Sequence, residues 1–210
     1  MKRIVNLIAA MLVAFAAYGQ TPVNQSVITM TVVSSKVDIN LPHENSRVLT
    51  IDWGDGIKED FLNKKDSREY SHTYSKSSTY KITITGVNIT GLGCSKQYLT
   101  SLDVSKCPTL EGLFCSENFL TSLDVSKNTV LTMLSCGGNQ LTSLDVSKNT
   151  ALKELNCYNN QLTSLDVSKN TALTYLDCRS NQLTSLDVSK NTALTEGNLN
   201  YDKDKVKLIK

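Results

Sequence analysis

The sequence has no excess of charge of either sign. The full chain carries a formal net charge of +2, and without Lys2 and Arg3 the remainder has 20 basic and 20 acidic residues. Residues 89–198 have eight basic residues against ten acidic ones. Nucleic-acid binding needs clustered Lys and Arg that displace counterions. The charge balance therefore excludes nucleic acid from the expected partners.

Long hydrophobic runs are also scarce. The only extended one covers residues 4–17, follows Lys2 and Arg3, and ends at the sequence Ala17-Tyr18-Gly19. A basic start, a short apolar run and a small-residue cleavage site are typical of a signal peptide. The run falls short of the ~20 residues that span a membrane. We expect residues 1–19 to be a signal peptide for export to the periplasm, the cell surface or the medium, and the mature chain not to insert into membranes.

Histidine is rare, with His43 and His72 only, and neither lies in a recognised nucleophile motif. We therefore expect no catalytic residues, no cofactor and no enzymatic activity. An acidic segment contains Asp52 and Asp55, followed by Glu59 and Asp60. Its spacing does not match a calcium-binding loop, so a solvated turn is the preferred interpretation and a calcium site the alternative.

A repeat dominates the second half of the chain. The string LTSLDVSK begins at Leu99 and recurs every 21 residues, at Leu120, Leu141, Leu162 and Leu183. A period of this length indicates stacked structural repeats. One unit cannot bury its own apolar positions, but turns stacked at ~4.8 Å form continuous buried columns.

Two of these columns contain residues other than leucine. Asparagine recurs at Asn118, Asn139, Asn160 and Asn181, where the chain must leave a short strand. We expect these amides to be structural and to hydrogen-bond to backbone groups of neighbouring turns. Cysteine recurs at Cys94, Cys115, Cys136, Cys157 and Cys178.

The cysteine column is interpreted as structural. In-register thiols point in the same direction, whereas a zinc site needs ligands that converge from short spacings, so no metal is expected. Disulfides between neighbouring turns are possible but would be strained, because parallel side chains hold their Cβ atoms wider apart than the bond prefers. Cys107 lies off the column, at the position where other repeats have Asn128 or Asn149.

The unit resembles the leucine-rich-repeat consensus L-x-x-L-x-[L/C]-x-x-N-x-L, and its LTSLDVSKNTA half is similar to repeats of secreted Bacteroidetes proteins and of internalins. The resemblance implies a solenoid with a parallel concave sheet over residues 89–198. The first turn has Gln97 in place of the repeated Asn, and the last has Gly197 in place of Leu. Both departures indicate capping turns. Residues 199–210 form a tail that could close the core as a last strand.

Residues 20–88 form a different module. Alternating polar and apolar residues, as in Val37, Ile39 and Leu41, predict a small antiparallel β assembly. The segment Trp53-Gly54-Asp55-Gly56, with Tyr70-Ser71-His72-Thr73-Tyr74 and Tyr80, resembles the signatures of polycystic-kidney-disease (PKD) domains. These are β-sandwich modules of cell-surface proteins. The expected fold is therefore mainly β, with a PKD-like sandwich or partial sandwich before the solenoid.

Variable positions of the repeat indicate the ligand-binding surface, because invariant positions build the stack. They are expected on the concave face and are rich in aromatic residues and Arg, which anchor many interfaces. The predicted ligand-binding residues are Phe114, Glu117, Met133, Glu154, Asn156, Tyr158, Tyr175, Asp177 and Arg179. The function implied is non-catalytic recognition of a protein or glycan, and the alternative is a spacer or surface-display module without a specific ligand.

Overall fold

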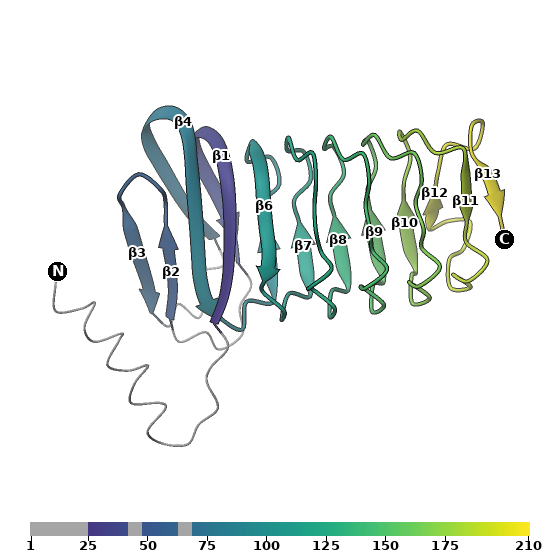
Figure 1. Ribbon diagram of the computed structural model, residues 1–210, viewed down its shortest axis with the longest axis horizontal. Helices are drawn as coiled ribbons and strands as arrows, with labels where there is room; N and C mark the ends of the chain where they lie inside the picture. The colour runs from purple at the N-terminus through teal and green to yellow at the C-terminus, as the bar shows by residue number, and fades with distance from the viewer. Residues whose placement is uncertain (1–24, 42–47, 63–68) are drawn as a thin grey trace, which may run out of the picture.

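The chain folds into a mainly β structure whose stacked turns run along its longest axis (Figure 1). The computed structural model describes residues 25–41, 48–62 and 69–210, so the predicted signal peptide lies outside the described residues. One eleven-stranded sheet has the order β12-β10-β9-β8-β7-β5-β1-β4-β2-β3, with β6 pairing with β1, and a second sheet joins β11 to β13. The solenoid predicted from the 21-residue period is confirmed.

The strands differ greatly in length. The antiparallel part contains β1 (Gln25–Asn40), β2 (Val48–Asp52), β3 (Lys58–Leu62), β4 (Glu69–Val87) and β6 (Leu99–Lys106). The parallel part contains three-residue strands, one from each turn, and a two-residue strand at the end: β5 (Gly91–Gly93), β7 (Gly112–Phe114), β8 (Met133–Ser135), β9 (Glu154–Asn156), β10 (Tyr175–Asp177) and β12 (Leu199–Asn200). The second sheet contains β11 (Ser185–Asp187) and β13 (Lys207–Ile209).

Strand β1 joins the N-terminal module to both sides of the first solenoid turn. It pairs with β4 along its length, and the register shifts between Ser34 and Lys36. The Ser34 hydroxyl stabilises this irregularity by donating to Lys36 O at 2.6 Å and accepting from Lys36 N at 3.1 Å. Residues before the shift pair with β6, and Asn40 after it pairs with β5. The module therefore continues the solenoid's hydrogen bonding across the expected boundary near residue 88, and the division into two domains stays a prediction.

The acidic segment forms a turn held by its own hydrogen bonds. Asp52 Oδ1 accepts from Gly54 N at 3.1 Å, and Asp55 Oδ1 accepts from Ile57 N at 3.0 Å. Asp55 Oδ2 lies 2.8 Å from His72 Nε2, and the His72 ring stacks on Trp53 with ring centroids 4.9 Å apart. These contacts give the carboxylates of Asp52 and Asp55 structural roles in the turn. The likeness to PKD domains remains a resemblance of sequence.

Gln97 explains why the first turn departs from the repeat. Its Oε1 accepts from Asp38 N of β1 at 2.7 Å, while its Nε2 donates to Ser95 O at 2.9 Å. The side chain of Gln is one methylene longer than that of Asn, so it reaches the neighbouring strand. Next along the chain, Tyr98 O accepts from Val33 N at 3.3 Å. The departures therefore mark the contact between the first turn and β1.

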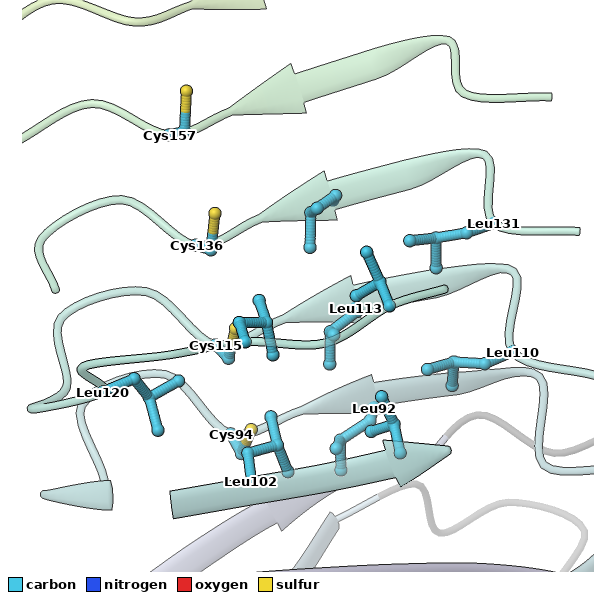
Figure 2. Close-up of a cluster of buried hydrophobic side chains, with 14 of the residues drawn as sticks. Leu92, Cys94, Leu102, Leu110, Leu113, Cys115, Leu120, Leu131, Cys136 and Cys157 are labelled. Atoms are coloured by element: carbon cyan, nitrogen blue, oxygen red, sulfur yellow. The ribbon is translucent and has the colours of Figure 1, made fainter. Parts of the chain in front are cut away.

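The repeated apolar residues form buried columns inside the solenoid. Leu113 pairs in register with Leu92 and Leu134, and the same register continues to Leu155 and Leu176. Figure 2 shows leucine and cysteine side chains of successive turns stacked in the interior of the solenoid. The Cys136 and Cys157 thiols point in the same direction. The repeated Leu, Val and Cys residues of the turns are buried, except Leu194 in the last turn, which is half-buried. Each turn thus depends on its neighbours to exclude water.

The predicted asparagine column fills one bend of each turn. Asn139 Oδ1 accepts from Leu120 N at 3.0 Å, while its Nδ2 donates to Cys115 O at 3.1 Å and Cys136 O at 2.9 Å. Asn160 and Asn181 repeat these three bonds one and two turns later. In the geometry of the structure, these amides bond to the backbone of two successive turns.

A second asparagine column, which the sequence analysis did not identify, fills the opposite bend. Asn149 Nδ2 donates to Val125 O at 3.0 Å and Asn128 O at 2.8 Å, and equivalent bonds recur at Asn128, Asn170 and Asn191. The Oδ1 atoms of these four residues have no protein partner among the described residues. The side chains therefore stabilise the bend through their Nδ2 donors. Cys107 begins this column, and its thiol lies 3.4 Å from Ile89 O.

The aspartates of LTSLDVSK cap a turn on the outer surface. Asp124 Oδ1 accepts from Ser126 N at 2.8 Å, and Asp103, Asp145, Asp166 and Asp187 each accept from the corresponding serine. The backbone and side-chain hydrogen bonds of Ser126 hold the pKa of Asp124 below its usual value. The repeated aspartates therefore have a structural role in each turn.

The last turn is longer than the repeat predicts. A 21-residue step would place Gly197 opposite Leu176, whereas the structure pairs Leu176 with Leu199. Beyond it, Val206 is buried and β13 runs parallel to β11. The lysines that flank β13 leave a charged outer edge, which discourages pairing with other chains.

Replacing Asn149 by Ala is expected to lower the free energy of unfolding by about 1–3 kcal/mol, because two buried carbonyl groups lose their donor. Urea unfolding followed by circular dichroism measures the change. Thr150→Ala is the control, since Thr150 is the exposed next residue. Equal stabilities of the two variants would contradict a structural role for the second column.

Candidate functional site

The predicted ligand-binding residues lie in four columns along the parallel sheet. Met133, Glu154 and Tyr175 share the position before the buried leucine, and Phe114, Asn156 and Asp177 share the position after it. The turn that follows each strand carries Tyr158 and Arg179 in a third column and Glu117 in a fourth. We call the surface formed by these columns the concave face.

Phe114 and Met133 form an apolar shelf on the concave face. Phe114 is 38% exposed and Met133 36% exposed, which is high for large apolar side chains on a sheet. Both side chains reach over Gly112: a Cβ there would crowd Phe114 Cε2 at 3.2 Å and would be in ordinary contact with Met133 Cε at 3.7 Å. We define these three residues as the apolar shelf.

The Tyr158 ring lies over a second glycine. A Cβ added at Gly137 would lie within 2.3 Å of ring carbons of Tyr158, so no other residue could stand there without moving the ring. Asn156 Oδ1 lies next to the same ring and accepts from Tyr158 N at 3.3 Å. The glycine therefore gives the tyrosine a defined place on the sheet.

Arg179 is held by a buried carboxylate. Asp177 is only 3% exposed, so it is not an accessible ligand contact in this structure. Its Oδ1 accepts from Arg179 Nε at 3.0 Å and its Oδ2 from Arg179 Nη2. The pair is a fork that fixes the guanidinium plane. The Arg179 side chain nevertheless stays 54% exposed, and Asp177 raises the pKa of its guanidinium.

Glu117 lies at the edge of the concave face. Its φ is 55°, and Lys96, Asn159 and Ser180 have similar positive values at the same point of their turns, with Gly138 between them. The Glu117 side chain is 3.3 Å from Lys96 Nζ, and both groups are largely exposed. Its backbone N donates to Gly137 O, so the residue also continues the stack. Only Gly138 revealed this left-handed bend in the sequence.

The concave sheet extends beyond the repeats onto β1 and β4. The edge of β5 pairs with β1, and a hollow opens there between the module and the first turn. Its lining consists of Asp38, Ile39, Asn40, Glu69, Tyr70, Ser71, Gly93 and Ser95. Because Gly93 pairs with Phe114, the hollow borders the apolar shelf. No repeat period extends into this region, so the sequence analysis missed it.

The five thiols of the cysteine column and the thiol of Cys107 are buried. All six thiols are free in the described structure, and none is exposed. Burial raises the pKa of the Cys94 thiol to about 12 and that of Cys178 to about 12, and raises the pKa values of the three thiols between them well above the usual value. A thiolate is the reactive form of cysteine. These thiols are therefore unreactive parts of the core.

Neither a cluster of potential metal ligands nor a membrane-spanning helix occurs among the described residues. Within the described ranges, no three His, Cys, Asp or Glu side chains lie in a group that could hold a metal ion. In the same ranges, no helix has the length and apolar character needed to cross a membrane.

Comparison with known proteins identifies the class of the repeat. Residues 129–170 match the family model of leucine-rich repeats in two copies. The chain is thus a leucine-rich-repeat protein with a solenoid fold. No curated protein sequence matches it.

Two solved structures share this solenoid. The functional domain of InlJ from Listeria monocytogenes, described as including a cysteine ladder, is 45% identical over 52% of this chain and 26% of that one, with a TM-score of 0.50. A leucine-rich-repeat protein of Leptospira interrogans is 25% identical over 54% of this chain and 31% of its own, also with a TM-score of 0.50. The likeness thus spans about half of this chain and less than a third of either relative. It confirms the predicted likeness to internalins.

Burial predicts that all the thiols resist labelling in the folded protein. At pH 8 a thiol reagent such as 5,5′-dithiobis(2-nitrobenzoate) is expected to react with none of the six cysteines until urea unfolds the chain, because the raised pKa values keep them protonated and the core excludes the reagent. Absorbance at the thionitrobenzoate band gives the count. Rapid reaction of the native protein would contradict the buried column.

Proposed function

We propose that this protein is a non-catalytic recognition protein that binds a macromolecular ligand on its concave face. The observation that carries the proposal is the apolar shelf. Exposed Phe114 and Met133 lie side by side on a rigid sheet, where burial against a partner would remove apolar surface from water. We further propose that the chain is exported by its N-terminal signal peptide and acts in the periplasm, at the cell surface or outside the cell.

The extent of the sheet supports a modest interface. Eight strands, from β12 through β10, β9, β8, β7, β5 and β1 to β4, follow one another in the sheet. At ~4.8 Å between strands and about 13 Å of usable width they offer on the order of 500 Å². A standard interface uses ~800 Å² per partner. The expected affinity is therefore moderate unless several copies of the protein act together.

A spacer without a specific ligand is the second candidate. The near identity of LTSLDVSKNT in successive turns favours it, because stability alone would keep those positions. A spacer, however, gives no reason for Phe114 and Met133 to be exposed beside one another on the concave face. The two candidates differ in whether the concave residues matter for binding.

A capture experiment separates the two candidates. The chain from residue 20 onward is immobilised beside a concave variant carrying Phe114→Ser, Tyr158→Ser, Tyr175→Ser and Arg179→Ser. A matched outer-surface variant carries Thr142→Ala, Ser143→Ala, Thr163→Ala and Ser164→Ala, all at exposed positions. All three proteins must first show similar melting temperatures. Host-cell surface extracts and extracellular-matrix extracts are then passed over each.

We expect the native protein and the outer-surface variant to retain the same partner, and the concave variant to lose it. Capture that is equal for all three proteins would place binding elsewhere, with the N-terminal module the next region to test. Failure of all three to retain any partner would favour the spacer.

A further inference from the structure

We infer that the concave face reads a linear protein segment that presents an apolar side chain to the shelf of Gly112, Phe114 and Met133 and an acidic side chain to Arg179. This inference rests on the proposed function and specifies its partner. It combines two features of one sheet that differ in chemistry and lie a short distance apart.

The shelf selects an apolar group. It carries no charged side chain, and its floor is the bare backbone of Gly112. Met133 contributes a flexible, polarisable side chain that adapts to different apolar shapes. A sugar would need several hydrogen-bonding groups around such a surface. The neighbouring positions on this side are Gly91 and Gly93 of β5, which provide no side-chain donors or acceptors.

Arg179 is the polar anchor of the proposed binding site. The Asp177 carboxylate engages Nε and Nη2, so two of the five guanidinium N–H groups are occupied and three remain for a ligand. Because Asp177 is buried, a partner meets the guanidinium and not the carboxylate. A planar donor held in one orientation suits a carboxylate, which accepts two parallel hydrogen bonds.

Geometry sets the spacing of the two groups. Arg179 follows β10, which lies three strands from β7 and two from β8. At ~4.8 Å between strands the two anchor points are separated by about 10 to 15 Å along the stack, and Arg179 also lies two positions beyond the row of Phe114 and four beyond that of Met133. The combined separation is about 16 Å, so at ~3.3 Å per residue of an extended peptide the apolar and acidic residues would stand about four to six positions apart. Glu154 lies in a different column from Arg179, on the other side of the buried leucine, which directs the acidic residue toward the Tyr158 side.

The test uses a phage-displayed library of random linear dodecapeptides, panned on the chain from residue 20 onward. The library is first depleted on a variant carrying Phe114→Ser, Met133→Ser and Arg179→Gln. Enriched sequences are expected to share an apolar and an acidic residue about four to six positions apart. A synthetic peptide of the enriched sequence is then titrated into protein labelled with ¹³C at the methionine methyl groups. The methyl signal of Met133 should shift, while that of Met30, 1% exposed, should not.

Two single variants test the polar anchor. Arg179→Gln should weaken peptide binding about tenfold or more, because a charge-assisted hydrogen bond is lost. Asp177→Asn distinguishes a positioned guanidinium from a merely positive surface. It leaves the site more positive, so attraction by charge alone would strengthen binding of an acidic peptide, whereas loss of the fork should weaken it severalfold. Both variants are compared with the native chain at equal melting temperature.

The outcomes separate this inference from the proposed function. If enriched peptides carry a basic residue in place of the acid, bind Arg179→Gln as well as the native chain, or bind Asp177→Asn more tightly, the inference fails while the concave face stands. If no peptide is enriched and a glycan array gives binding that Phe114→Ser abolishes, the partner is a glycan and the inference fails. If the affinity of the enriched peptides is unchanged by every substitution on the concave face, both the inference and the proposed function are contradicted.

Discussion

The backbone carbonyl groups buried at the two bends of each turn constrain the whole solenoid. Each 21-residue turn reverses direction around a core of leucine side chains. At the bends, backbone polar groups are buried where water cannot reach them. An unpaired buried group costs ~1–3 kcal/mol. Side-chain amides such as Asn139 at one bend and Asn149 at the other donate to those carbonyls. Each amide bonds across to the preceding turn, so the turns must stack in register.

Register in turn determines which positions can carry function. Once the bends are aligned, the Leu and Cys side chains of every turn fall into shared buried columns, and a change there would disturb both neighbours. The outer surface is also committed, because each repeated Asp caps its turn through a serine N–H. The positions beside the buried leucine of each strand vary between turns. Asn156 and Asp177 accept from a backbone N–H two residues on, whereas Phe114 and Met133 are apolar and exposed. We therefore place the proposed recognition on the concave face, where side chains differ from turn to turn.

How far the sequence could predict this structure depended on whether a feature repeats. The leucine and cysteine columns, and the amides represented by Asn160, recur at a fixed step and were predictable. The amides represented by Asn170 recur equally, but Asn after Ser-Lys is also an ordinary turn residue, so its buried role stayed hidden. Contacts made only once could not be predicted. They include the bond from β1 to Gln97, the extra residues that bring Leu199 opposite Leu176, and the fork that buries Asp177.

The candidate site shows why a narrow concave face can still bind. Its side chains are held before any ligand arrives, with Phe114 against Gly112, Tyr158 against Gly137 and Arg179 in the fork of Asp177. Ordering a free side chain at an interface costs about 0.5–1.5 kcal/mol. Three anchors already in place avoid most of that cost, which offsets part of the affinity lost to a small contact area. The same stacking that satisfies the buried carbonyls positions these side chains, so the fold also underlies the recognition that we propose.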